Sequence, residues 1–206
     1  PGAISFEAVR QLQQDLGKGR FAWVGHATDD PESTAVIGVS GNAVAGTFNH
    51  RGKLYKLEPR ANGDHVLSEV KNTEPVPEHD PIPVADETSI APLSTVSTGT
   101  AADSDGSVID LLVVYTPAVE SLYGSEGDDA LIILAVAETN QAYINSNMTT
   151  RVNLAGVYRT NYIESGDMLT DLTRLSTPND GFMDEVHAVR NIYGADIVSL
   201  IEASGN

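Results

Sequence analysis

The sequence has 206 residues, 41% of them hydrophobic and 6% aromatic, as in an ordinary globular protein with one large or two small cores. Its 29 Asp and Glu residues against 12 Lys and Arg give a net charge of −17, which repels nucleic-acid phosphates and anionic lipid headgroups. We therefore expect neither nucleic acid nor a membrane as a partner. The lack of cysteine excludes disulfides, thiolate metal sites and a cysteine nucleophile.

The first 71 residues are predicted to form a small antiparallel β-rich domain. Residues 5–16 are expected to be a short amphipathic helix or an irregular lead-in, and Pro1 suggests that the natural chain begins earlier. Five short runs with alternating hydrophobic residues predict strands. They cover 21–24, 35–39, 43–48, 53–57 and 65–70. Gly, Asn and Asp predict tight turns at 40–42 and 61–64, and the sheet is expected to curl over Trp23 and Phe48.

Residues 72–106 are predicted to form a linker. The first part holds five of the ten prolines, which favour extended backbone, and the second part is rich in Ser, Thr, Ala and Gly. A segment of this composition is where proteases cut first. We therefore expect two separable structural units, 20–71 and 107–201, joined by an exposed tether.

From residue 107 the pattern changes to alternating strands and helices. Strands are predicted at 108–117, 152–158 and 195–201, a long helix at 128–148, and one or two helical turns at 169–175. A further helix at 182–193 is expected to turn Met183, Val186, Val189 and Ile192 inward and to end at Gly194. A β-α-β-α-β order predicts a largely parallel sheet, so the whole chain is assigned to the α+β class.

Few residues suggest chemistry of their own. The sequence has no nucleophile elbow, phosphate loop, dinucleotide fingerprint or HExxH motif, and no two of its five histidines have the spacing of a helical metal pair. We interpret His187 as a polar-face or cap residue, the patch Glu138, Asn140 and Gln141 as a solvated helix face, and 164–167 as a turn. No residue in this sequence is therefore assigned to catalysis or substrate binding.

Four segments resemble the opening half of bacterial reprolysin-like metalloendopeptidases, which are metzincins and include a peptidyl-Asp type. They read IDLLVVYTPA (109–118), LAVAETNQAYINS (134–146), NYIESGD (161–167) and GFMDEVHAVRNIYGADIVSLI (181–201). The stretches WVGHATDDPESTAVIGVSGNAVAGT (23–47) and KLYKLEP (53–59) resemble the β-rich propeptide of that family. The resemblance implies a propeptide at 1–71, a linker at 72–106 and the first part of a metzincin-like catalytic domain at 107–206.

The same resemblance implies a zinc site made by three histidines of an HExxHxxGxxH motif, whose glutamate is the general base. Because these 206 residues lack that motif, we expect the chain alone to bind no zinc and to be inactive. The intact enzyme is expected to be a secreted bacterial zymogen that hydrolyses peptide bonds in protein substrates. This chain is expected to supply scaffold. The sheet edge and apolar face of its second unit are expected to need cover from the propeptide, the rest of the catalytic domain or a second copy.

Two other functions compete with this interpretation. The chain could be a non-catalytic, inhibitor-like or protein-binding module, or an adhesion domain of the von Willebrand A type. The second lacks support, because residues 115–120 do not contain the D-x-S-x-S metal motif. For latency, we expect either that the propeptide covers the cleft sterically or that a linker side chain fills the open zinc position, with Asp80 favoured and His79 next.

Overall fold

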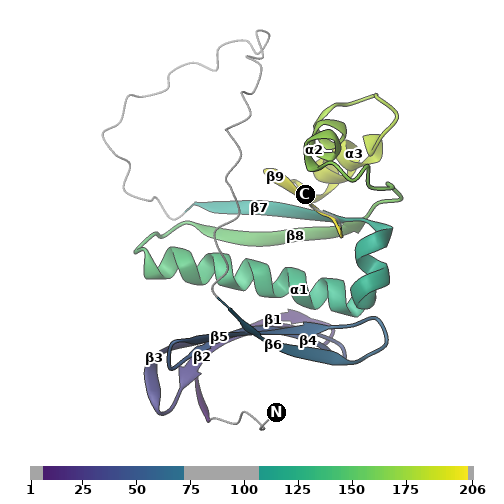
Figure 1. Cartoon of the computed structure of the whole chain (residues 1–206). Coiled ribbons are helices and arrows are strands. Elements are labelled where there is room, and N and C mark those ends of the chain that lie inside the picture. The colour runs from purple at the N-terminus through teal and green to yellow at the C-terminus, as the bar shows by residue number, and fades with distance from the viewer. Residues whose placement is uncertain (1–6, 72–106, 204–206) are drawn as a thin grey trace.

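A computed structural model describes residues 7–71 and 107–203. The first range forms sheet A, an antiparallel meander in which each strand pairs with the next along the chain (Figure 1). Its strands are β1 (Ala8–Gly17), β2 (Arg20–Ala27), β3 (Asp30–Ser40), β4 (Ala43–His50), β5 (Lys53–Pro59) and β6 (His65–Val70). The antiparallel sheet, its five predicted strands and the two predicted hairpin turns are confirmed.

The expectation of a helix or irregular lead-in at 5–16 is wrong, because these residues contribute β1. Gln13 lies opposite Trp23 of β2, and the two strands are joined through Gly17 and Gly19, which both have a φ of +75°. Pairing with β2 gives the backbone of this edge strand hydrogen bonds along its length. The hydrophobic spacing that suggested a helix does not outweigh that gain.

The core of sheet A also differs from the prediction, because Trp23 and Phe48 lie on the face that points away from the rest of the molecule. Thr47 faces a helix, so its neighbour Phe48 faces the other way. A Cβ on Gly25 would lie 2.4 Å from the Trp23 ring, so this ring packs against Gly25 of its own strand. The buried residues of the sheet are instead small, with Val24, Val36 and Ala45 at the helix side.

The second range forms a three-stranded parallel sheet with helices, as predicted, and the α+β class is confirmed. In this sheet B the strand order is β8-β7-β9. Its elements are β7 (Val108–Tyr115), α1 (Pro117–Asn145), β8 (Arg151–Arg159), α2 (Met168–Ser176), α3 (Asp184–Tyr193) and β9 (Ile197–Ile201). All three predicted helices are present, and Gly194 ends α3 with a φ of +64°, as expected.

Helix α1 begins well before its predicted start. Thr116 is the N-cap, and its hydroxyl accepts a hydrogen bond from the backbone N–H of Val119. At Gly124 the backbone leaves helical geometry, with φ +73° and ψ +160°, so two helical segments meet there at a kink. The helix predicted at 128–148 corresponds to the segment after this kink, because the glycine interrupts the hydrophobic pattern on which the prediction depended.

Helix α1 lies between the two sheets (Figure 1). On one side Ile132 packs with Val113 and Tyr115 of β7, and on the other side Ala130 and Leu134 pack against sheet A. Helices α2 and α3 cover the opposite face of sheet B. That cluster contains Leu112, Val114, Tyr162, Leu175, Met183, Val186 and Ala195.

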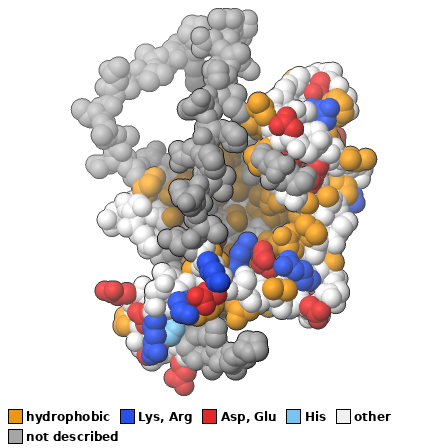
Figure 2. Space-filling view, in the orientation of Figure 1, with side chains coloured by type: hydrophobic (Ala, Val, Ile, Leu, Met, Phe, Trp, Pro, Cys, Tyr) orange, Lys and Arg blue, Asp and Glu red, His pale blue; other side chains and the backbone are white. Residues whose placement is uncertain are grey.

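Several large hydrophobic side chains remain at the surface of the α/β part. Ile163 and Ile192 are 84% and 80% exposed, so the predicted inward position of Ile192 is wrong. Hydrophobic side chains are visible among polar ones at the upper right of Figure 2, where Figure 1 places α2 and α3. None of the helices in the two described ranges has both the length and the apolar character that a membrane span requires.

Limited proteolysis tests the predicted tether. We expect the first cuts between Pro75 and Gly106, because Pro-rich and Ser/Thr-rich sequence offers a protease accessible backbone, whereas α1 is covered on both sides. Mass spectrometry of the first fragments locates the cut. A first cut within α1 would contradict the division into two units.

Candidate functional site

The carboxyl ends of the three parallel strands meet at one edge of sheet B. Tyr115 of β7 lies opposite Arg159 of β8 and Ile201 of β9, so the chain leaves all three strands at the same level. In open α/β sheets this edge is where ligands bind. The residues that follow β7 and β8 are Thr116 and Thr160, which are fully buried. This carboxyl edge is therefore the candidate functional site.

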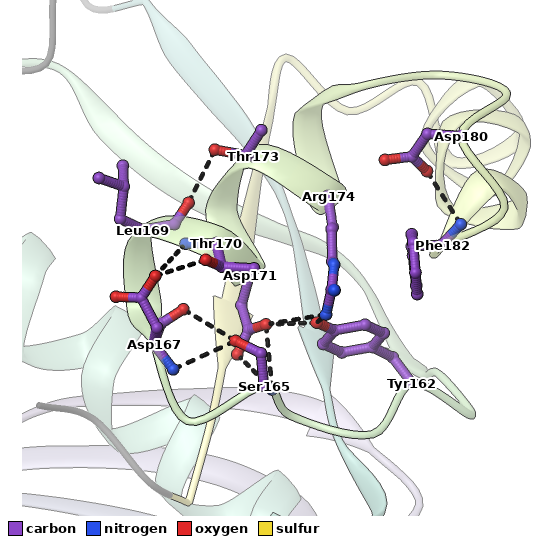
Figure 3. Close-up of polar contacts among 10 residues, drawn as sticks. All are labelled: Tyr162, Ser165, Asp167, Leu169, Thr170, Asp171, Thr173, Arg174, Asp180 and Phe182. Carbon is purple, nitrogen blue, oxygen red and sulfur yellow. Dashed lines mark hydrogen bonds and ion pairs between the residues drawn. The ribbon is translucent and has the colours of Figure 1, made fainter.

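Asp171 is the centre of a polar cluster at this edge (Figure 3). Its side chain is completely buried and accepts hydrogen bonds from the Tyr162 hydroxyl and from the backbone N–H of Ser165, at 3.0 and 3.1 Å to its two oxygens. Burial alone would favour the neutral acid. The hydrogen bonds outweigh burial and hold the pKa of Asp171 below its ordinary value.

Arg174 closes the cluster from the far end of α2. Its Nη1 donates to the Tyr162 hydroxyl oxygen at 2.7 Å and lies 3.9 Å from a carboxylate oxygen of Asp171. The guanidinium also lies over the Phe182 ring, 4.1 Å from its centroid, in cation–π geometry. A single cation thus connects the buried carboxylate with the aromatic rings that precede α3.

The predicted turn at 164–167 begins α2. Asp167 is the N-cap, and its carboxylate accepts from the backbone N–H of Thr170 at 3.1 Å. Glu164 points toward the strand ends instead. It accepts from the Thr116 hydroxyl at 2.5 Å and from the backbone N–H of Ala203 at 2.8 Å. The loop after β8 is therefore tied to the ends of β7 and β9 by one carboxylate.

Glu202 follows β9 and meets the same cluster. Burial, a hydrogen bond with Asp171 and the charges of Asp171 and Glu164 raise the pKa of Glu202 to about 7. Its Oε1 is buried and has no hydrogen-bond partner within the described residues. At pH values below about 7 Glu202 therefore holds its proton while Asp171 is ionised, which lets the two acids lie side by side.

A second acid with a raised pKa lies on the other side of sheet B. Asp128 of α1 is 2% exposed, and neither of its carboxyl oxygens has a hydrogen-bond partner in the described part of the chain. Burial raises the pKa of Asp128, and the negative charges of Glu120 and Asp129 raise it further, to about 7. Burial and the charge of Asp128 also raise the pKa of the nearby Tyr115 hydroxyl.

The structure does not bring the histidines together. His26, His50 and His65 belong to sheet A, His187 lies on α3, and the proposed latency ligands Asp80 and His79 fall outside the described residues. Across 7–71 and 107–203 there is no group of three or more His, Cys, Asp or Glu side chains that could hold a metal ion. The carboxylates at the carboxyl edge accept from protein donors, so they fit a structural cluster rather than a metal centre.

The interpretation of residues 138–141 as a solvated helix face is wrong for two of the three side chains. Glu138 accepts a hydrogen bond from the Thr47 hydroxyl of sheet A. Asn140 donates to the carbonyl of Val152 at 2.9 Å and accepts from its N–H at 2.8 Å. It therefore pairs both backbone groups of this residue at the outer edge of β8. The third, Gln141, is partly exposed and pairs with Asn145 on the same helix.

The sequence does not identify the buried acids Asp128 and Asp171 or the partly buried Glu202. For Asp171 a signal exists, because it lies four residues before the buried Leu175 and therefore on the same helix face. A carboxylate on the inward face of an amphipathic helix indicates a buried partner. Asp128 stands at the predicted start of the long helix, where a carboxylate suits the helix dipole, and nothing local in the sequence shows that the fold buries it.

Comparison with known proteins gives a consistent relationship. No family model matches the chain. It is 36% identical, over 95% of its length and 50% of the relative's, to a peptidyl-Asp metalloendopeptidase of Stenotrophomonas maltophilia. It is 38% identical to that of Xanthomonas campestris over 84% of the chain and 41% of the relative. The chain is homologous over most of its length to peptidyl-Asp metalloendopeptidases, and spans about half the length of the curated relatives it matches.

Proposed function

We propose that the chain is part of the precursor of a secreted bacterial zinc endopeptidase that hydrolyses peptide bonds in proteins. The observation that carries this proposal is the 36% identity over 95% of the chain to metalloendopeptidases of bacteria. Residues 1–71 would be the propeptide, 72–106 the linker, and 107–206 the first part of the catalytic domain. The described order, an antiparallel sheet followed by a parallel α/β unit, supports this division.

The described residues would act as scaffold for the reaction. Asp171, Glu164 and Glu202 fix the loops that follow β8 and β9, and Asn140 fixes the outer edge of β8. When bound, zinc would polarise the scissile carbonyl and lower the pKa of a water molecule. Because the described residues do not fit a metal centre, we assign the zinc ligands to another part of the longer protein.

Latency of the precursor is proposed on two alternative grounds. A side chain of residues 72–106, Asp80 first and His79 second, would occupy the open zinc position, since the chain has no cysteine to do so. Alternatively, the propeptide would cover the cleft without supplying a ligand. Alanine substitution of both residues in the full-length precursor separates these alternatives.

The test compares the full-length gene product with the 206-residue chain. We expect the full-length protein to bind about one zinc ion and, once activated, to hydrolyse casein until a chelator removes the metal. The 206-residue chain is expected to do neither. Metal analysis by mass spectrometry and a casein assay provide the measurements. A full-length protein that binds no zinc and cleaves nothing would favour the non-catalytic binding module instead.

A further inference from the structure

Sheet A and helix α1 share one hydrophobic seam. Val24, Val36 and Ala45 of the sheet are at most 3% exposed, and they pack with Ala130 and Leu134 of the helix, which are equally buried. These contacts join residues that lie about a hundred positions apart in the sequence. Exposed fractions this low are typical of the interior of one domain and not of the contact surface between two loosely tethered domains.

The approach of the helix to the sheet is closest at Gly38. A Cβ at this position would lie 2.3 Å from the carbonyl oxygen of Ala130 and 2.6 Å from the backbone nitrogen of Leu134. Only a residue without a side chain therefore fits, because the neighbouring atoms are backbone and cannot turn aside. Gly38 therefore lets the backbone of α1 come close to β3 at this position, and a larger residue would keep the helix away.

Polar contacts surround the hydrophobic seam, and three acids of α1 supply them. Asp129 forms a two-point ion pair with Arg20, with Nη2–Oδ1 at 2.8 Å and Nε–Oδ2 at 2.6 Å. Glu126 accepts from the backbone N–H of Asn42 at 3.1 Å. Glu138 accepts from the Thr47 hydroxyl, as described above. Each of these three carboxylates on α1 thus accepts from, or pairs with, a donor of sheet A.

The kink of α1 belongs to the same surface. A break in a helix leaves carbonyl groups of the preceding turn without their partners. The carbonyl of Leu122 accepts instead from the backbone N–H of Ala61, at 3.0 Å, in the turn after β5. Arg60 lies over the Tyr123 ring, 5.7 Å from its centroid, and Pro59 packs against Gly127. Sheet A therefore supplies a hydrogen-bond donor to a helix carbonyl at the kink, where the regular helical partner is lost.

We propose that residues 7–71 are a binding partner for α1 and remain bound to the α/β part after the chain is cut within 72–106. The interaction surface is the hydrophobic seam with the Arg20–Asp129 pair and the contact at the kink. Its occupant is sheet A of the same chain, because the hydrophobic seam, Asp129 and the Leu122 carbonyl at the kink all have their partners there. The inference concerns the described residues alone and does not depend on the longer protein being a protease.

The experiment places a recognition site for a sequence-specific protease within residues 72–106 of the full chain and cuts it under native conditions. We expect both fragments to elute together in size-exclusion chromatography at micromolar concentration, and native mass spectrometry to find one molecule of each in the complex. Fragments that separate, or an α/β part that precipitates and leaves a soluble sheet A behind, would overturn the proposal.

Two kinds of variant test the assigned surface. Gly38→Val is expected to separate the fragments, whereas Val39→Thr, next to it but on the opposite face of β3, is not. Arg20→Glu is expected to weaken the complex by at least about tenfold, and adding Asp129→Arg is expected to restore it. Arg10→Glu, the same change at an exposed position, serves as the charge control.

Each variant is compared with its uncut chain by circular dichroism, so that a loss of binding is read only where sheet A still folds. If Gly38→Val and Arg20→Glu both elute as the parent does, the two parts associate through another surface and the assignment is wrong. Rescue by the charge exchange is the decisive result, because a variant that merely unfolds is not repaired by a substitution on the partner.

Discussion

At pH 8 the Asp128→Asn variant is expected to be more stable than the parent chain, by up to about 4 kcal/mol. The carboxyl of Asp128 is buried without a hydrogen-bond partner in the described residues, and its pKa is raised from 3.8 to about 7. Ionisation in the folded protein therefore costs free energy that the amide avoids. Urea unfolding followed by circular dichroism gives the free energies of unfolding.

The effect has a defined pH dependence. Because the folded protein binds the proton of Asp128 more tightly than the unfolded chain does, its contribution is most favourable below pH 4 and is lost as the pH rises through 7. The gain from Asp128→Asn should therefore be small at pH 4 and complete at pH 8. The exposed Glu32→Gln removes one charge elsewhere and should show no such trend. An equal gain at both pH values would contradict the raised pKa.

Asp171→Asn is expected to destabilise the protein by about 3 kcal/mol at pH 6. The amide cannot accept equally from the Tyr162 hydroxyl and the Ser165 N–H, and Arg174 loses its anionic neighbour in a buried site. The measurement is again the free energy of unfolding. At pH 6 Glu202 still holds its proton, so relief of repulsion between the two acids does not mask the loss.

The pH dependence of this second variant runs in the opposite direction. The pKa of Asp171 is lowered, so its stabilising contribution is present above the unfolded value of 3.8 and is lost as the pH falls through the folded pKa. The deficit of Asp171→Asn should therefore shrink in acid. Asp180→Asn, an exposed residue that accepts one backbone N–H, should cost far less. A variant at Asp171 that is as stable as the parent would show that the cluster does not hold the loop.

The sequence predicted the strands and helices where a local pattern determines them. Alternation, turn residues and Gly194 located the elements of sheet B and five strands of sheet A, because pleat and helix periods are visible in a short window. The pattern failed at residues 8–17 and at Gly124. In both places a contact outside the local window decides the structure. Residues 8–17 pair with the next strand, β2, and the carbonyl of Leu122 at the break in α1 accepts from the N–H of Ala61, which is remote in the sequence.

The candidate site was less accessible to sequence reasoning, because burial of an acid is a property of packing. Asp128 lies on α1, Asp171 on α2 and Glu202 just after β9, and their neighbours are brought together only by the fold. Asn140 shows the same limit: its spacing on α1 resembles a solvated face until β8 is placed beside it. Side chains whose partners are remote in the sequence cannot be identified by a window that spans one helix.

The strand order of the two sheets has a consequence for the order in which the chain folds. Every pairing in sheet A joins consecutive strands, so only short loops must close before it forms. The pairings of β7 with β8 and with β9 span far longer loops, and parallel pairing of that kind is slow. Sheet A would therefore form early, and α1 would pack against this completed sheet before the parallel strands have paired.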